Sequence, residues 1–255
     1  MSGQRPITAS SAAGAMQQEW EQRARENARF YICTDVPSDD ASFFASGAQD
    51  YDRHVRPFLQ AQAFDPQGKT ALEIGCGMGR MTAVFAQEFG EVVGIDVSPE
   101  MVQKARARGV PGARYLLGSG CDLAGVADSS VDFVFSYIVF QHIPEEAMIL
   151  RYFEEAGRVL RPGGLFRLHV NGLPHVDIGG ILLEGYLSAS PRLPAILRGR
   201  IPFIRRRRLS TWLGHPAPLS GVRAVCKGSG LEITEVTGKW TAEMWVSGRR
   251  EEVRI

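Results

Sequence analysis

The sequence predicts an α/β protein with a doubly wound, mostly parallel sheet and helices on both faces. Short β-type runs alternate with amphipathic runs of helical period over residues 70–171. A glycine-rich turn at residues 73–80 joins the first β-type run to the first helical one. Two further β-type runs near the C-terminus flank a glycine and indicate a closing antiparallel hairpin. Such alternation requires parallel strands joined by helical crossovers.

The composition is that of a globular protein. Of the 255 residues, 44% are hydrophobic and 22% are charged, which excludes the disordered and fibrous classes. That length suffices for one large domain with an appendage or for two small domains. The 29 Lys and Arg residues balance 28 Asp and Glu residues, so net charge gives no indication of a nucleic-acid or membrane partner.

The four cysteines lie far apart and form no Cys-x-x-Cys pair, so neither a zinc site nor a disulfide framework is indicated. The first twenty residues lack the apolar block of a secretory signal. The longest apolar stretch, residues 131–140, contains Asp132 and is too short to span a bilayer. We therefore expect a soluble, cytoplasmic protein.

Each element is expected from a local pattern. Residues 16–28 carry apolar side chains at four-residue spacing, which predicts an amphipathic helix. Residues 50–60 predict a second helix, which Pro57 interrupts. Ser98 as a capping residue and Gly109 as a stop bound a later helix, and two more begin near residue 79 and after residue 144. The strands expected in the alternating region are 70–74, 91–96, 113–117, 131–136 and 165–171.

The C-terminal third departs from this alternation. Residues 161–164 end the last helix and turn into the fifth strand. Residues 172–220 contain six prolines, and the arginines at 192–208 form a block of seven positive charges without an acid. That block is able to hold an anionic substrate, a membrane surface or a partner, although a solvated face or a mobile cap is the plainer interpretation. The expected hairpin consists of strands 231–237 and 240–246 around Gly238-Lys239.

The turn Glu73-Ile-Gly75-Cys-Gly77-Met-Gly79-Arg80 lets a ligand approach the backbone at the carboxyl edge of the sheet. A dinucleotide site would need glycine three residues after Gly77, where Arg80 stands. Glu73 would also repel a pyrophosphate, whereas it would favour a ligand with an ammonium and a sulfonium group. S-adenosylmethionine is such a ligand.

Two acidic residues stand at or after the carboxyl ends of the second and third expected strands. Asp96 ends the second strand, nineteen residues after Gly77, where an acid accepts hydrogen bonds from ribose hydroxyls. Cys121-Asp122-Leu123 follows the third strand and offers an acid and backbone amides to an adenine edge. Together these residues predict an adenosine-binding edge of the sheet.

With these residues the chain resembles the class I S-adenosylmethionine-dependent methyltransferases, especially the bacterial small-molecule enzymes. The resemblance covers roughly residues 70–171, and four ordered motifs carry it, at 72–80, 94–101, 131–144 and 160–165. It implies a seven-stranded sheet whose last strand is antiparallel, and methyl transfer from S-adenosylmethionine to oxygen or nitrogen of a small molecule. The residues and the resemblance together assign cofactor binding to Glu73, Gly75, Cys76, Gly77, Gly79, Arg80, Asp96, Val97, Met101, Cys121, Asp122, Leu123, Ser136 and Tyr137.

The expected domain organisation places the extra length around this core. Residues 1–62 are expected to form an N-terminal helical lid, and residues 63–255 the methyltransferase domain with a cap-like insertion at about 172–230. Aromatic side chains of the N-terminal region would either cover the cofactor or pack plainly against the sheet. They are Trp20, Tyr31, Phe43, Phe44 and Tyr51.

His142 is the catalytic candidate. Methyl transfer is an in-line displacement, so the protein supplies alignment and, for a hydroxyl acceptor, a base. His142 follows the fourth strand, and its ordinary pKa suits proton abstraction near neutrality. An equally weighted alternative is a structural role, in which His142 forms a hydrogen bond with the backbone or caps the next helix. After the fifth strand, pocket lining or loop positions are expected for Asn171, His175 and Asp177, and His169 is expected in the core.

Several alternatives are disfavoured. Metal-dependent catechol-type enzymes of this fold carry an acid where Ser136 stands, so no metal is expected. Ser136-Tyr-Ile-Val also lacks the motif of nucleic-acid amino methyltransferases, which disfavours base flipping. A nicotinamide-dependent oxidoreductase is disfavoured by Glu73 and Arg80, and a non-catalytic S-adenosylmethionine-binding partner or sensor protein stays as the other alternative. The expected partner is a small-molecule acceptor, with an anionic acceptor left open.

Overall fold

The computed structural model describes residues 11–33, 39–172 and 214–252. Within these ranges one seven-stranded sheet has the order β3-β2-β1-β4-β5-β7-β6. β1 to β5 pair in parallel, whereas β7 runs antiparallel to both β5 and β6, which confirms the predicted fold class. The strands are β1 Thr70–Ile74, β2 Glu91–Asp96, β3 Ala113–Leu117, β4 Val131–Ser136, β5 Leu160–Val170, β6 Leu231–Thr237 and β7 Met244–Arg250.

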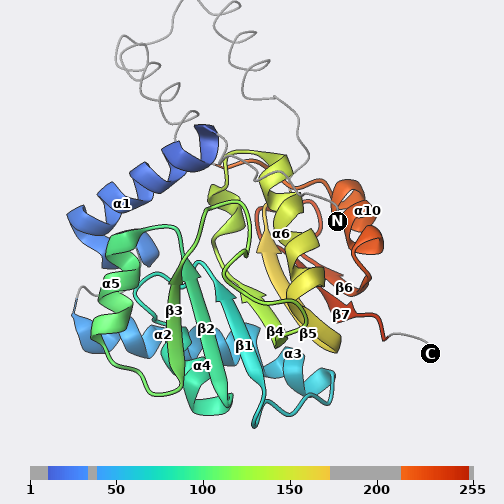
Figure 1. The fold of residues 1–255 in the computed structure, drawn as a ribbon, viewed down its shortest axis with the longest axis horizontal. Helices are drawn as coiled ribbons and strands as arrows, with labels where there is room; N and C mark the ends of the chain where they lie inside the picture. The colour runs from blue at the N-terminus through green and yellow to red at the C-terminus, as the bar shows by residue number, and fades with distance from the viewer. Residues whose placement is uncertain (1–10, 34–38, 173–213, 253–255) are drawn as a thin grey trace, which may run out of the picture.

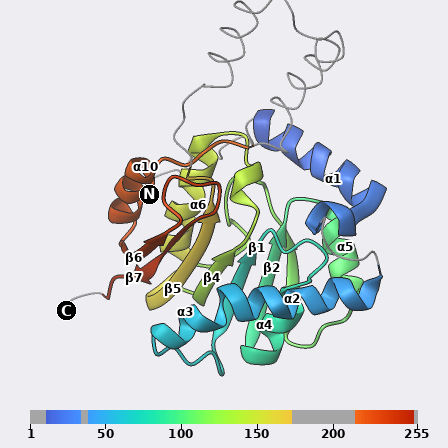
Figure 2. The same ribbon diagram turned by 180° about the vertical axis from the view of Figure 1, so that it is seen from behind.

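Helices cover both faces of the sheet. Figure 1 shows α6 in front of the strands with α10 beside it, and Figure 2 shows α2, α3 and α4 on the opposite face. α1 lies across one end of the sheet in both views. The helices are α1 Ser11–Ile32, α2 Asp40–His54, α3 Arg56–Ala61, α4 Thr82–Glu88, α5 Pro99–Ala107, the 3₁₀ turn η1 Phe140–His142, α6 Glu146–Val159 and α10 Leu219–Gly228.

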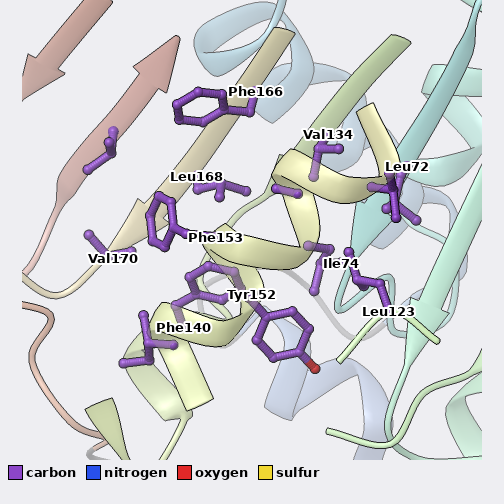
Figure 3. Packing of buried hydrophobic residues seen from close by; sticks show 14 of the residues in the cluster. Leu72, Ile74, Leu123, Val134, Phe140, Tyr152, Phe153, Phe166, Leu168 and Val170 are labelled. Carbon is purple, nitrogen blue, oxygen red and sulfur yellow. The ribbon is translucent and has the colours of Figure 1, made fainter. Parts of the chain in front are cut away.

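The largest hydrophobic cluster lies between the sheet and the α6–α10 layer. Figure 3 shows the rings of Phe140, Phe153 and Phe166 packed together beside aliphatic side chains of β4 and β5. Phe153 is fully buried, so its truncation to Ala would cost about 3–5 kcal/mol. The Tyr152 hydroxyl lies at the edge of the labelled group in Figure 3. This packing fixes the carboxyl ends of the central strands, where the site lies.

The C-terminal hairpin differs from the prediction at its second strand. β6 has the expected bounds, but β7 begins at Met244 and not at residue 240. Trp240 has φ of +65° and is 66% exposed, and Thr241 N donates to Gly238 O. A left-handed residue in a turn cannot continue a strand, so the connection runs from Gly238 to Glu243.

Other element bounds also shift. β5 begins at Leu160, so residues 161–164 belong to the strand. α4 begins at Thr82 because the glycine loop extends past residue 79. The helix expected over 50–60 is divided at Val55, and Pro57 lies in the first turn of α3, where it needs no amide partner.

The predicted lid and insertion are only partly separate from the core. α2 and α3, which the sequence assigned to the lid, pack on the sheet through Tyr51, Val55, Phe58 and Leu59. α10 falls within the expected insertion, yet its Val222 and Cys226 join the largest core cluster. The arginine block at 192–208, with His175 and Asp177, lies outside the described residues.

Candidate active site

A cavity opens at the carboxyl ends of β1, β2 and β4. Its volume is about 990 Å³, counting the space open to solvent at its mouth. α1, the glycine loop after β1, the loops after β2 and β3 and the segment after β4 contribute to its wall. The topology therefore gathers side chains at one edge that lie far apart in the sequence.

The glycine loop is held close to its neighbours. Gly75 N and Cys76 N both donate to Ile95 O, at 2.7 and 3.0 Å, which ties the loop to β2. Gly75 has φ of +75°, and a Cβ there would lie 2.2 Å from Val139 Cγ2. A Cβ at Gly77, where φ is +53°, would lie 2.8 Å from Ile32 Cδ1. Both positions need glycine for conformation, and Gly75 needs it for space as well, because the branched Val139 side chain leaves no room for a Cβ.

Asp96 stands at the end of β2, and its carboxylate is able to accept further hydrogen bonds. Its Oδ2 accepts from Gly77 N and its Oδ1 from Ser98 N, each at 2.9 Å. A carboxylate has about four lone-pair sites, so two remain for hydroxyl donors. Burial raises the pKa of Asp96, and the bonds from Ser98, Gly77 and Val97 amides oppose that rise. These features fit a ribose diol.

Glu73 is a second carboxyl group on the cavity wall, and it is only 6% exposed. Burial raises its pKa to about 8, while the hydrogen bond from Thr82 Oγ1 and the charge of Arg80 oppose the rise and Asp96 adds to it. The group is therefore protonated near neutrality. A cation in the cavity would favour its ionised form, so the site fits a ligand that carries an ammonium group.

Arg80 joins the glycine loop to α2. Its guanidinium is 8% exposed, lies 2.6 Å from Asp50 Oδ2 and donates to Ser46 Oγ at 3.0 Å. A Cβ at Gly47 would lie 2.4 Å from Arg80 O, so the α2 backbone packs directly on the loop. No short-range pattern in the sequence indicates these α2 partners, which precede Arg80 by thirty residues or more.

α1 crosses the cavity and is held there by hydrogen bonds to the β2–α5 connection. Gln17 Nε2 donates to Val97 O at 3.1 Å. Glu21 Oε2 accepts from Ser98 Oγ at 2.6 Å and from Glu100 N at 2.9 Å. Three side chains of α1 reach the cavity wall besides Tyr31, namely Met16, Trp20 and Ile32.

The aromatic residues expected over the cofactor divide into two groups. Trp20 and Tyr31 line the cavity. Phe43 and Tyr51 are instead buried on α2, and Phe44 lies under the Arg108 guanidinium. Plain helix packing therefore describes the aromatic residues of α2.

The segment after β4 forms another part of the wall. Ser136 Oγ donates to Ile74 O at 3.1 Å, and Ser136 is fully buried outside the cavity lining. Tyr137, Ile138 and Val139 line the cavity. Ile138 has φ of +55° and is 38% exposed. A left-handed backbone costs a non-glycine residue about 1–2 kcal/mol, and a β-branched residue adopts it only as an outlier.

His142 closes this segment and lines the cavity. Its ring centroid lies 5.3 Å from that of Trp20 at an interplanar angle of 67°. Its Nε2 lies 3.4 Å from Gln141 Nε2. The imidazole thus lies on the cavity wall, where a catalytic base would need to be. It also packs against Trp20, as a structural residue would.

The loop after β3 lines the cavity with two glycines, whereas its acidic residue, Asp122, is not part of the lining. Gly118 and Gly120 line the cavity. Asp122 accepts from Ser119 Oγ at 2.7 Å and from Ala124 N at 3.2 Å, whereas Leu123 is buried in the core. Sequence reasoning missed these two glycines and Tyr152, although successive small residues after a strand were a usable signal.

The predicted cofactor residues thus fall into two groups. Those on the cavity wall are Glu73, Gly75, Cys76, Gly77, Arg80, Asp96, Val97, Met101 and Tyr137. Those outside the cavity lining are Gly79, Cys121, Asp122, Leu123 and Ser136. Gly79 serves packing, because a Cβ there would lie 2.7 Å from the Tyr115 hydroxyl.

His169 is buried in β5, as expected of a core histidine. Its ring lies 5.4 Å from that of Tyr137 and 5.0 Å from that of Trp245, and it is 2% exposed. Burial lowers its pKa to about 4, with smaller contributions from His54 and His142.

The described ranges contain neither a metal-binding cluster nor a membrane-spanning helix. No group of three His, Cys, Asp or Glu side chains there is suited to a metal ion. None of the helices in these ranges combines the length and apolar character needed to cross a bilayer.

Comparison with known sequences identifies relatives of this region. A methyltransferase domain family matches residues 72–168. An uncharacterized methyltransferase of Mycobacterium sp. strain KMS is 36% identical over 155 residues, which span 56% of this chain and 59% of that protein. A ubiquinone biosynthesis O-methyltransferase of Xanthomonas oryzae pv. oryzae strain PXO99A is 30% identical over 163 residues, or 62% and 66% of the two chains. The chain thus spans about 59% of the length of the first of these relatives.

Solved structures share the fold. Magnesium protoporphyrin IX methyltransferase from Synechocystis, with bound S-adenosylhomocysteine, superposes with a TM-score of 0.63 at 15% identity, covering 94% of this chain and all of that one. A SAM-dependent methyltransferase from Methanosarcina mazei gives 0.54 at 19% identity, covering 78% and 99% of the two chains.

Proposed function

We propose that this chain is a class I S-adenosylmethionine-dependent methyltransferase, in line with the match of residues 72–168 to a methyltransferase domain family. It would transfer the methyl group of S-adenosylmethionine to an oxygen or nitrogen atom of a small molecule. The observation that carries this proposal is the pairing of two carboxyl groups with a glycine loop on one cavity wall. Glu73 and Asp96 flank Gly75–Gly77 there. Such a wall suits a cationic amino acid joined to a ribose.

Each cofactor group has a candidate partner. Asp96 would accept the ribose hydroxyls through its remaining lone pairs, and Glu73 would ionise next to the ammonium group. Gly118 and Gly120 would border the adenine, with Asp122 available at the rim. α1 would exclude water by covering the cavity with Trp20. The cofactor, when bound, supplies a methyl group already activated on a sulfonium.

The acceptor is expected at the segment after β4. Tyr137 and His142 line the cavity there. His142 would take the proton of an acceptor hydroxyl, either directly or through a water molecule. The O-methyltransferase name of the Xanthomonas relatives supports oxygen as the methylated atom. α1 would then serve as a lid over the cavity.

Calorimetric titration tests the cofactor assignment. The chain should bind S-adenosylmethionine and S-adenosylhomocysteine, and bind a nicotinamide dinucleotide far more weakly. Asp96→Asn should weaken cofactor binding by roughly 10–100-fold, since a charge-assisted hydrogen bond contributes about 1.5–3 kcal/mol. Asp65→Asn is the matched control, because Asp65 is exposed in a loop outside the cavity lining. Preferential binding of the nicotinamide dinucleotide would reject the proposal.

A further inference from the structure

We propose that Ile138 determines acceptor specificity, and that the acceptor is an uncharged small molecule which places an apolar body against Ile138 and a hydroxyl near His142. This inference rests on the proposed function and deepens it. Three independent features of the described residues carry it: the backbone of Ile138, the exposure of its side chain, and the charges on the cavity wall.

The first feature is a backbone conformation that disfavours isoleucine. Ile138 has φ of +55°, a region in which a β-branched residue is an outlier. Contacts on both sides impose this conformation. Ser136 Oγ bonds to Ile74 O, the Val139 side chain fills the space above Gly75, and His142 N donates to Val139 O at 2.9 Å. The fold therefore fixes the turn, and glycine or asparagine would suit it better than isoleucine.

The second feature is the exposure of this side chain. Ile138 is 38% exposed and lies on the cavity wall, whereas Ser136 and Phe140 near it are buried. The exposed part of a branched aliphatic side chain gives no hydrophobic stabilisation. The backbone disfavours isoleucine here, and the described chain leaves more than a third of its surface uncovered, whereas an apolar molecule in the cavity would cover it. Such strained residues cluster at ligand sites.

The position of Ile138 places that molecule beside the cofactor. Val139 is the next residue, and its Cγ2 occupies the space next to Gly75. A molecule on Ile138 is therefore adjacent to the loop that would hold the methyl donor. His142 lies at the end of the same segment and faces the same cavity, so a hydroxyl of that molecule is within reach of an imidazole.

The third feature is the charge balance of the described cavity wall. Glu73 and Asp96 are carboxyl groups, and the positive charge of Arg80 is matched by Asp50, 2.6 Å from its Nη1, although its buried Nε has no hydrogen-bond partner among the described residues. An anionic acceptor would lose its hydration and gain only a cation that Asp50 already neutralises. Other side chains of the cavity lining, such as Trp20 and Ile143, are aromatic or aliphatic. The wall therefore selects a neutral, apolar body.

Two phenols with the same reacting group test this proposal. The chain saturated with S-adenosylhomocysteine is titrated calorimetrically with 4-heptylphenol, which has an apolar tail, and with 4-hydroxybenzoate, which has an anionic one. We expect at least tenfold tighter binding of 4-heptylphenol. Ile138→Ala should reduce that preference by roughly tenfold, as expected when an apolar pocket loses several carbon atoms, and leave the affinity for S-adenosylhomocysteine within about twofold.

Ile138→Gly separates the side chain from the backbone. It should lose the preference as Ile138→Ala does, yet have a melting temperature about 2–4 °C above that of the Ala variant, because only glycine relieves the left-handed conformation. Ala63→Gly is the matched control: Ala63 has φ of +49° and lies outside the cavity lining, so its phenol preference should not change.

The outcomes separate this inference from the function on which it rests. Failure to bind S-adenosylhomocysteine overturns the proposed function and this inference with it. Normal binding of S-adenosylhomocysteine with equal or tighter binding of 4-hydroxybenzoate overturns this inference alone. Retention of the full preference for 4-heptylphenol by Ile138→Ala also overturns this inference and leaves the proposed function standing.

Discussion

Replacing Glu73 with Gln should stabilise the chain while weakening its hold on the cofactor. Glu73 is 6% exposed, and burial raises its pKa from 4.5 to about 8. The folded state without ligand therefore keeps the proton that the unfolded state releases above pH 4.5. The stability that this carboxyl contributes is full below pH 4.5 and is lost as the pH rises through 8.

The magnitude follows from that interval. Each pH unit between the two pKa values costs about 1.4 kcal/mol, so at pH 7 the folded state has lost about 3 kcal/mol. Gln carries no proton to lose, and its amide oxygen is able to accept the Thr82 hydrogen bond that Glu73 accepts. Glu73→Gln should therefore raise the melting temperature by roughly 6–12 °C at pH 7 and by much less at pH 5.

Thermal unfolding of the ligand-free chain between pH 5 and pH 8 measures this gain, with Glu243→Gln as a control at an exposed carboxylate. Calorimetry should show the same Glu73 variant binding S-adenosylmethionine roughly 10–100-fold more weakly, because the ammonium loses an ionised partner. A gain in melting temperature that does not grow with pH, or cofactor binding as tight as in the parent, would refute the reasoning.

Three further substitutions test other parts of the site. His142→Ala should lower kcat for a hydroxyl acceptor by roughly 10²–10⁴-fold with cofactor affinity within about twofold, and a fully active variant would dismiss the base role. Burial lowers the pKa of His169 to about 4, so the stability that this residue contributes is present above pH 6.5 and is lost as the pH falls toward 4. The His169→Phe variant should lose less stability between pH 7 and pH 5, as measured by urea unfolding. An unchanged pH dependence would contradict this expectation. Gly47→Ala should destabilise the chain by about 1–3 kcal/mol, because the added Cβ would lie 2.4 Å from Arg80 O. The midpoint of urea unfolding measures this loss. An unchanged midpoint would contradict the close packing of α2 on the glycine loop.

The sequence predicted best those elements whose residues interact locally. β1 to β4 have the predicted bounds because short, mostly apolar runs with turn residues at their ends define them. The Ser98 cap and the Gly109 stop bound α5 for the same reason. Trp240 misled the prediction, since an aromatic residue after Gly238 favours a strand while its left-handed backbone forms a turn.

The candidate site was predictable only along the strands that form it. Glu73 and Asp96 lie near or at the ends of β1 and β2, and Gly77 lies in the loop after β1, so a pattern of strand, loop and acid indicates them. Asp50 engages Arg80 across 30 residues of sequence, and such an ion pair leaves no periodic signal. Ile138 is similar, because its positive φ results from contacts of its neighbours with Ile74 and Gly75 and not from its own residue type.

Formation of S-adenosylhomocysteine tests the central claim most directly. The chain is incubated with S-adenosylmethionine and a library of hydroxylated and aminated small molecules, and both the demethylated cofactor and the methylated product are measured by mass spectrometry. We expect S-adenosylhomocysteine in equal amount to an O- or N-methylated product. The Asp96→Asn variant should form neither at cofactor concentrations that saturate only the parent. Tight cofactor binding without either product across the library would contradict catalysis and favour a protein that only binds the cofactor.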